Sequence, residues 1–276
     1  MEIDTQTTRA NDGSVIHYEA RGKPSPEHPS LVFLHYYGGS PSTWAPLLAQ
    51  PPFADFHTVC YHARGWAPST GPPDPGAYGI EAMSSDLSAI LSATGLRDSR
   101  AGFVLVGHSM GAKVAQHYAA TVAAASPHLK GLVLVAPAPL RGLELPAEAK
   151  AQQRAAYESA ESVRFVLDNV LTAAPGALAE DAVAACVGDS LRGNEWAKVA
   201  WPEYALGQGF GDLVDRIQAP VLVLRGDKDF EKDMVGLLGT DSGWINKDIE
   251  NCGHLVPLEQ PVQLGKEILA FVRKIS

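Results

Sequence analysis

The sequence predicts an α/β fold built on a mostly parallel, doubly wound sheet with a helical insertion. Short apolar runs alternate with helix-like stretches, which is typical of a parallel sheet covered on both faces. One apolar run, residues 103–106, leads through a glycine-flanked turn into a helix-like segment, residues 112–120. A long interval without a clear strand candidate separates residue 136 from residue 221, and it is far longer than an ordinary connection.

The strand candidates are apolar runs bounded by turn residues. Asp12-Gly13 before the run 15–18 predicts the turn of an N-terminal hairpin. The proline-rich stretch 68–76 is predicted to be a surface loop, because proline cannot donate to a strand ladder. The further strand candidates, in chain order, are residues 31–35, 57–61, 103–107, 132–136, 221–225 and 244–249.

Residues 140–212 are predicted to form the helical insertion. Five apolar residues fall there at helical spacing, and residues 177–187 repeat the pattern. We therefore divide the chain into a core of residues 1–139 and 213–276 and an insertion of residues 140–212. The five apolar residues are Val163, Val166, Leu167, Val170 and Leu171. Four aromatic residues either line an apolar pocket or pack in a core: Phe165, Trp196, Trp201 and Tyr204.

Length and composition favour one large domain. The chain has 276 residues, of which 46% are hydrophobic and 19% charged, enough to supply a single core. No apolar run reaches the roughly 18 residues of a membrane span, and the polar N-terminus has no apolar stretch typical of a secretory signal. We therefore expect a soluble protein without a membrane partner.

The cysteines indicate the cellular compartment of the protein, and its net charge indicates which partners it can bind. Cys60, Cys186 and Cys252 show no paired spacing, which favours a reducing compartment, with the cytoplasm as the default. The formal net charge is −9, and no cluster of Lys and Arg is present. Because binding to phosphate backbones needs such clusters, we expect no nucleic-acid partner.

The stretch Gly107-His108-Ser109-Met110-Gly111 carries the most chemical information. It is a G-x-S-x-G nucleophile elbow between an apolar run and a helix-like segment. Such a turn forces its central residue into a strained backbone conformation, so the flanking positions must lack bulk. The hydroxyl of Ser109 is then expected at a helix N-terminus, where N–H groups and the helix dipole favour developing negative charge.

A serine hydroxyl needs a base to take its proton and a third group to hold that base. His254 is the candidate base, on a loop that begins with Gly253 and precedes a proline-started amphipathic segment. The strand candidate 221–225 runs into Asp227 and Asp229. Because these two lie two positions apart, strand alternation points both the same way and does not choose between them.

These motifs make the chain resemble the α/β-hydrolase superfamily over nearly its whole length. The order Ser109, acid, His254 is that of the α/β-hydrolase fold. The loop 35–40 after the strand candidate 31–35 resembles the superfamily's His-Gly-x-Gly oxyanion loop. The superfamily's Gly-x-x-Asp pattern, which begins here at Gly226, implies Asp229 as the acid, with Asp227 as the alternative.

A further block, residues 62–69, resembles the superfamily's Asp-x-Arg-Gly-x-Gly-x-Ser turn. Two of its marker positions differ, because His62 replaces the Asp and Ala67 replaces a Gly. The role of the superfamily's Asp therefore does not carry over to His62. The resemblance also implies that the insertion caps the active site.

The resemblance implies backbone oxyanion donors at two positions, the N–H groups of Met110 and Tyr37. Tyr36 stands where the superfamily usually has glycine, so either tyrosine contacts the substrate or packs against the cap. Three histidines lie near the same motifs, and we expect structural hydrogen bonding for each of them rather than direct chemistry. They are His35, His108 and His117.

The implied function is that of a cofactor-independent, carboxylesterase-like serine hydrolase. It would cleave an ester or similar carbonyl group of a small, largely apolar molecule through an acyl-enzyme, without cofactor or metal. One alternative is a carbon–carbon bond hydrolase with the same triad, although the loop 35–39 does not resemble that of the ring-fission group. Another is a non-catalytic ligand receptor on the same fold. Dehalogenases and epoxide hydrolases carry Asp at the elbow, where this chain has Ser109.

Overall fold

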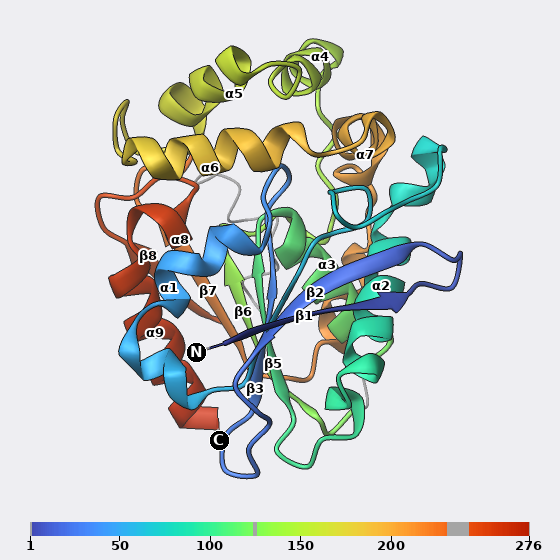
Figure 1. Cartoon of the computed structure of the whole chain (residues 1–276), viewed down its shortest axis with the longest axis vertical. Helices are drawn as coiled ribbons and strands as arrows, with labels where there is room; N and C mark the ends of the chain where they lie inside the picture. The colour runs from blue at the N-terminus through green and yellow to red at the C-terminus, as the bar shows by residue number, and fades with distance from the viewer. Residues whose placement is uncertain (1, 124–125, 231–242, 276) are drawn as a thin grey trace.

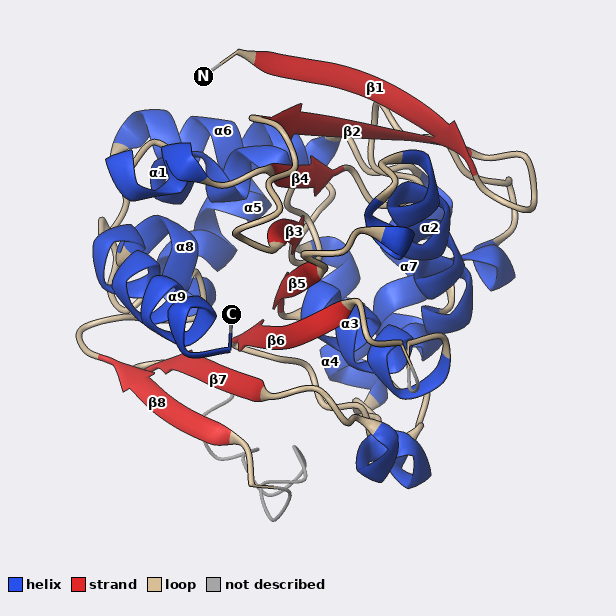
Figure 2. Ribbon diagram, turned by 90° about the horizontal axis from the view of Figure 1, so that it is seen from below, coloured by secondary structure: helices blue, strands red, loops and turns tan. Residues whose placement is uncertain are grey.

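The computed structural model describes residues 2–123, 126–230 and 243–275. In these ranges one eight-stranded sheet runs through the molecule in the order β1-β2-β4-β3-β5-β6-β7-β8 (Figures 1 and 2). The strands are β1 (Ile3–Arg9), β2 (Val15–Arg21), β3 (Ser30–Leu34), β4 (Thr58–Tyr61), β5 (Phe103–His108), β6 (Leu129–Val135), β7 (Val221–Gly226) and β8 (Ile245–Ile249).

The sheet is mostly parallel, with an antiparallel hairpin at one edge. Strand β2 pairs antiparallel with both β1 and β4, whereas β4, β3, β5, β6, β7 and β8 pair parallel with their neighbours. The carboxyl ends of these six strands therefore meet at one edge of the sheet. The predicted fold class is confirmed.

Helices cover both faces of the sheet, as Figure 2 shows. Helices α2 and α3 pack on one face, and α1, α8 and α9 pack on the other. The helices are α1 (Ala45–Leu48), α2 (Ile80–Ala93), α3 (Met110–Thr121), α4 (Ala147–Ala155), α5 (Ala160–Val166), α6 (Glu180–Leu191), α7 (Glu195–Ala200), α8 (Val256–Glu259) and α9 (Pro261–Ile275). Shorter 3₁₀ turns are η1 (Pro41–Trp44), η2 (Pro51–Asp55), η3 (Pro75–Tyr78), η4 (Leu96–Asp98) and η7 (Gly211–Arg216), and single π turns are η5 (Leu167–Leu171) and η6 (Trp201–Ala205).

Strand β5 shows how the sheet divides the core. Phe103 and Leu105 belong to the cluster shared with α2 and α3, and Val104 and Val106 belong to the cluster shared with α1 and α9. Successive side chains of a strand point to opposite faces, so a strand buried on both sides is apolar throughout. This is why the central strands could be predicted as continuous apolar runs.

The start of β6 differs from the prediction. The strand begins at Leu129 rather than at residue 132, because Lys130 and Gly131 interrupt the apolar run without interrupting the strand. A Cβ at Gly131 would lie 2.6 Å from Cδ1 of Ile275, so glycine at this position allows α9 to approach the sheet closely. The apolar pattern therefore does not reveal this part of β6, because the reason for its glycine is a tertiary contact.

The segment between β6 and β7 contains helices α4, α5, α6 and α7, which lie together at one end of the sheet (Figure 1). The apolar residues predicted at helical spacing over 163–171 lie partly in α5 and partly in the π turn η5. The pattern predicted over residues 177–187 corresponds to α6, which begins later, at Glu180, and ends at Leu191. The division of the chain into a core and a separate cap at residues 140–212 stays a prediction.

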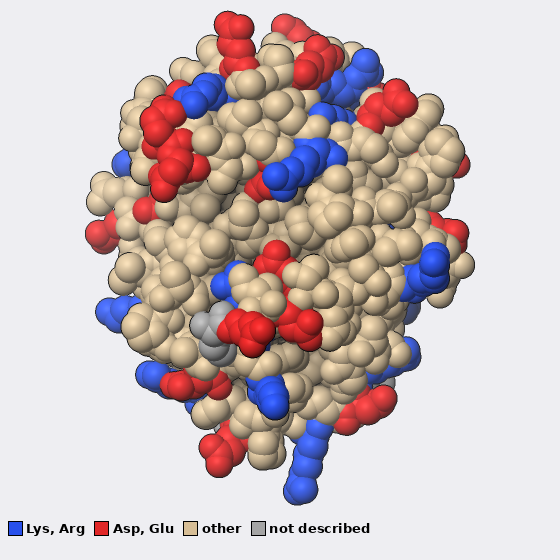
Figure 3. Space-filling view, viewed as in Figure 1, with Lys and Arg blue, Asp and Glu red and all other residues tan. Residues whose placement is uncertain are grey.

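No helix within the three described ranges is long and apolar enough to cross a membrane. Cys60, Cys186 and Cys252 are all buried and free. On the face drawn in Figure 3, Lys and Arg side chains are scattered among acidic ones rather than gathered into one basic patch.

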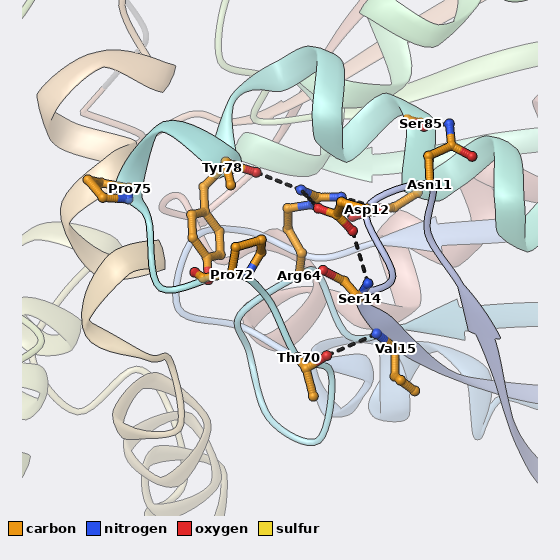
Figure 4. Close-up of polar contacts among 12 residues, drawn as sticks. Asn11, Asp12, Ser14, Val15, Arg64, Thr70, Pro72, Pro75, Tyr78 and Ser85 are labelled. Carbon is orange, nitrogen blue, oxygen red and sulfur yellow. Dashed lines mark hydrogen bonds and ion pairs between the residues drawn. The ribbon is translucent and has the colours of Figure 1, made fainter.

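Arg64, in the block that follows β4, is the centre of a buried ionic network. Its Nε and Nη2 atoms donate to the two carboxylate oxygens of Asp86, each at 2.6 Å. Its Nη1 atom donates to the carbonyl of Ala77 at 2.6 Å and lies 3.0 Å from Asp12, in the turn between β1 and β2 (Figure 4). The guanidinium thus joins the hairpin turn, the loop after β4 and α2.

Removing the charge of Asp86 should destabilise the fold, because the Arg64 guanidinium would then be buried without its bidentate partner. We expect Asp86→Asn to lose about 3 kcal/mol of the free energy of unfolding, measured by urea titration. Glu203→Gln is the control, because Glu203 forms an ion pair with Arg154 at the surface. The side chain of Arg154 is 49% exposed and that of Glu203 is 38% exposed. The control should lose less than about 1 kcal/mol. Equal losses in the two variants would contradict a structural role for the network.

Candidate active site

Ser109 occupies a strained turn between β5 and α3. Its backbone has φ 52° and ψ −110°, outside the regions that a residue with a side chain normally adopts. The turn is fixed from β6, because the N–H of Ser109 donates to the carbonyl of Val135 at 2.9 Å. Met110 begins α3, so its N–H belongs to the first turn, whose N–H groups have no acceptor within the helix.

The two glycines of the elbow lie against neighbouring backbone. A Cβ at Gly107 would be 2.6 Å from Cα of Ala112, and a Cβ at Gly111 would be 2.4 Å from the carbonyl oxygen of Leu34 in β3. No side chain fits at either position. Strands β3 and β5 and helix α3 therefore meet in backbone contact directly beneath Ser109.

His254 and Asp229 form a buried pair beyond the ends of β8 and β7. The Nδ1 atom of His254 lies 3.1 Å from both carboxylate oxygens of Asp229, and both side chains are almost fully buried. Asp227 points elsewhere: it accepts from the N–H of Cys252 at 3.0 Å and lies 3.3 Å from Lys228. Of the two candidate acids, the structure thus brings Asp229 to the imidazole.

Strand alternation did not distinguish the two aspartates because β7 ends before them, at Gly226. The N–H of Asp229 donates to the carbonyl of Gly226 at 3.2 Å, which closes a turn. A Cβ at Gly226 would lie 2.1 Å from the carbonyl oxygen of Gly253. The loop that carries His254 therefore packs directly on the end of β7, and glycine at position 226 makes this approach possible.

The backbone of His254 is held from two sides. Its carbonyl accepts a hydrogen bond from Nε2 of His108 at 2.8 Å, and its N–H donates to the carbonyl of Leu171 in the insertion at 2.9 Å. Burial lowers the pKa of His108 to about 3, so this imidazole stays neutral. His108 thus has the structural hydrogen bond that the sequence led us to expect.

Glu259 anchors the same loop, and the sequence analysis did not single it out. Its carboxylate accepts from the N–H of Gly253 at 3.1 Å and from the N–H of Ala173 in the insertion at 2.7 Å. Burial raises the pKa of this carboxyl group, against the opposing effect of its backbone hydrogen bonds. The only signal in the sequence that could have indicated this role is that Glu259 is the one acidic residue in the apolar stretch 255–259.

The loop after β3 is also bonded to the insertion. The hydroxyl of Tyr157 donates to the carbonyl of Tyr37 at 3.1 Å, and the hydroxyl of Ser190 donates to the carbonyl of Gly38 at 3.0 Å. Gly38 has φ +94°, a conformation that favours glycine. The rings of Tyr36 and Tyr37 both line the cavity described below and also pack in the apolar core.

His35 has a structural role. The Nδ1 atom of its ring lies 2.7 Å from the carbonyl oxygen of Tyr36. The Nε2 atom accepts a hydrogen bond from the N–H of Ala63 at 3.0 Å. Burial lowers the pKa of His35 to about 4, so it remains the neutral tautomer that donates from Nδ1. His117 differs from the expectation, because its Nδ1 is buried without a hydrogen-bond partner and its ring packs edge-on against Phe210 at 4.6 Å.

Ser109 and His254 line one small cavity of about 40 Å³, and residues of the insertion line it as well. Of the four aromatic residues singled out in the insertion, Trp201 lines this cavity, and Trp196 and Tyr204 pack against the core. Phe165 does neither, since it is 64% exposed. Among the described residues, the lining consists of Tyr36, Tyr37, Ser109, Gln153, Tyr157, Leu171, Trp201, Leu206, Phe230 and His254.

The arrangement combines a hydroxyl at a helix N-terminus with an imidazole that a carboxylate orients. A group with this environment can lose a proton to the imidazole and attack an electrophile, while nearby N–H groups stabilise negative charge. In the ranges that the structure describes, no group of three or more His, Cys, Asp and Glu side chains could hold a metal ion.

Comparison with known proteins relates the chain to one family. The profile of the alpha/beta hydrolase family matches residues 31–266. Among characterised sequences, a monoacylglycerol lipase (abhd6-B) of Xenopus laevis is 26% identical over 282 aligned positions, which cover 94% of this chain and 79% of that protein.

Solved structures share the fold at low sequence identity. A bromoperoxidase from Bacillus anthracis superimposes with a TM-score of 0.83 at 16% identity, covering 98% of this chain and 100% of that one. A thermophilic esterase from Thermogutta terrifontis superimposes with a TM-score of 0.74 at 24% identity, covering 100% and 99% of the two chains. At these identities the similarity concerns the fold alone.

A buried lysine lies one helical turn after Ser109. Lys113 is fully buried, and its Nζ donates to the carbonyl of Leu206, a residue of the cavity wall, at 2.5 Å. Burial lowers the pKa of Lys113 to about 7, because the charged ammonium loses its hydration.

This buried lysine should make stability depend on pH. Between pH 7 and about pH 10 the unfolded chain binds more protons at Lys113 than the folded chain, so stability from this group rises with pH, by up to about 1.4 kcal/mol per unit. Lys113→Met removes this contribution. The unfolding free energy of wild type should therefore increase relative to that of Lys113→Met as pH rises from 7 to 10. Lys130→Met is the control, since Lys130 donates to the carbonyl of Pro127 from an exposed position. If the unfolding free energies of wild type and Lys113→Met differ by the same amount from pH 7 to 10, the lowered pKa of Lys113 is contradicted.

Proposed function

The chain belongs to the alpha/beta hydrolase family, and on this premise we propose that it is a serine hydrolase acting on an ester or similar carbonyl compound. The observation that carries the proposal is the convergence of three side chains from distant parts of the sequence. Ser109 shares a cavity with His254, and His254 is paired at 3.1 Å with Asp229.

In the first half of the proposed reaction, the hydroxyl oxygen of Ser109 attacks the substrate carbonyl carbon. Asp229 holds the proton on Nδ1 of His254, so the lone pair of the neutral ring is on Nε2, which takes the hydroxyl proton. The tetrahedral intermediate collapses when the carbon–oxygen bond to the leaving alcohol breaks. The alcohol oxygen takes the proton from His254, and the acyl group remains on Ser109.

In the second half, His254 takes a proton from water, and the resulting hydroxide attacks the acyl carbon. The bond to Ser109 then breaks, the serine regains its proton from His254, and the acid is released. No cofactor takes part in either half.

We propose that the N–H groups of Met110 and Tyr37 stabilise the oxyanion of both intermediates. The position of Met110 at the start of α3 and the wall position of Tyr37 support this assignment. Tyr157 would contribute indirectly, because its hydrogen bond to the Tyr37 carbonyl fixes the peptide backbone of that loop.

The size and lining of the cavity support a small substrate. Its volume is about 40 Å³, and its wall is mainly aromatic and aliphatic. A relative named as a monoacylglycerol lipase is consistent with ester chemistry. We propose that the groups nearest Ser109 are short.

Loss of the carboxylate beside His254 should stop turnover. We expect Asp229→Asn to lower kcat for a short-chain nitrophenyl ester by about 10³–10⁴-fold, because the amide favours the wrong imidazole tautomer. Asp227→Asn is the matched control and should stay close to the wild-type rate. A larger loss in Asp227→Asn would transfer the acid role to Asp227. Tight ester binding without turnover in wild type would favour a ligand receptor instead.

Loss of the Tyr157 hydroxyl should affect kcat more than KM. The carbonyl of Tyr37 would lose one hydrogen bond, worth about 1 kcal/mol, so we expect kcat of Tyr157→Phe to fall about fivefold. Tyr204→Phe is the control, since its hydroxyl donates to the carbonyl of Pro75, outside the cavity lining, at 2.6 Å. Steady-state kinetics in which both variants show the same kcat would argue against a role of Tyr157 in positioning the loop.

A further inference from the structure

The three tyrosines of the cavity wall already use their hydroxyl groups within the protein. The hydroxyl of Tyr37 donates to the carbonyl of Lys198 at 2.6 Å, and that of Tyr157 donates to the carbonyl of Tyr37 at 3.1 Å. The hydroxyl of Tyr36 lies beside the side chain of Cys186. Tyr37 and Tyr157 therefore present their aromatic rings, rather than unpaired polar atoms, to the cavity.

Gln153, on α4, is different. Its side chain lines the cavity together with Ser109 and His254, and its Oε1 atom is buried without a hydrogen-bond partner. A buried amide oxygen that has lost its water and gained no donor is unfavourable, and the imbalance is relieved when a ligand supplies the missing group. The amide of Gln153 thus marks a place where a bound molecule is expected to be polar.

We propose that Gln153 is a specificity-determining residue that hydrogen-bonds a hydroxyl group of the substrate, so that the enzyme prefers esters carrying a free hydroxyl. This inference rests on the proposed function. A hydroxyl group is both donor and acceptor, so it satisfies a glutamine amide in either of its two orientations. It can donate to Oε1 or accept from Nε2.

The charge of the wall favours a neutral polar group. None of the described residues that line the cavity is Lys, Arg, Asp or Glu. A carboxylate, phosphate or ammonium group bound there would be desolvated without a partner of opposite charge among these described residues. A hydroxyl group needs no such partner.

The volume limits the length of the arm that carries the hydroxyl. The cavity of about 40 Å³ is only about three times the roughly 10–15 Å³ that a cavity needs to hold one water molecule. Because Gln153 and Ser109 line the same small space, the hydroxyl lies a few bonds from the reacting carbonyl. The substrate class is therefore a short ester with a hydroxyl on its acyl or its alcohol part.

Two pairs of esters, matched in size, test this inference. In the first pair, 2-hydroxyethyl butanoate and propyl butanoate differ by a hydroxyl on the alcohol part. In the second, ethyl 3-hydroxypropanoate and ethyl butanoate differ by a hydroxyl on the acyl part. We expect wild type to prefer the hydroxyl member of at least one pair by about tenfold or more in kcat/KM.

Gln153→Met should remove this preference by lowering kcat/KM for the hydroxyl member toward the value for the apolar member, since methionine has a similar length and no amide. Gln152→Met is the matched control, because Gln152 is the exposed neighbour on the same helix, and it should keep the wild-type preference. Turnover by wild type without a hydroxyl preference in either pair, or a preference that persists in Gln153→Met, would overturn this inference alone. Hydrolysis of none of the four esters would instead overturn the proposed function, and this inference with it.

Discussion

The turn at Ser109 depends on a contact between three pieces of backbone that has no space for a side chain. Gly107 lies against the first turn of α3, and Gly111 lies against the carbonyl of Leu34 at the end of β3. Packing at this distance fixes Ser109 at φ 52° and points the start of α3 at the carboxyl edge of the sheet. The loop after β3 begins at the same point, and parallel pairing brings the ends of β7 and β8 to the same edge.

The insertion, the segment between β6 and β7, takes part in the geometry of the site through hydrogen bonds to its loops. Its Leu171 carbonyl holds the N–H of His254, and its Tyr157 hydroxyl holds the loop after β3 at Tyr37. Glu259 bonds the N–H groups of Gly253 and Ala173, so one carboxylate joins the His254 loop to the insertion. Backbone hydrogen bonds fix position more narrowly than apolar contacts do, so movement of the insertion would change both loops beside Ser109.

Local patterns were sufficient to predict the sheet and the elbow, because buried strands and a glycine-flanked turn leave a signature within a few residues. Strand alternation alone did not show which of Asp227 and Asp229 reaches His254. The turn that follows Gly226 determines this, and it is visible only in the structure. Lys130 and Gly131 concealed the start of β6, since the reason for glycine there is α9, far away in sequence. Gln153 was missed for the same reason: its significance is the cavity that it shares with Ser109, and only the folded chain creates that cavity.

The central claim is that Ser109, activated by His254 and Asp229, is the group that attacks the substrate. Reaction with a fluorophosphonate, followed by proteolysis and mass spectrometry, tests it most directly, because this reagent modifies serines that a base has activated. The account predicts one stoichiometric adduct on the peptide that contains Ser109, and none in Ser109→Ala. An adduct on a different residue, or an active wild-type enzyme that forms no adduct, would contradict it.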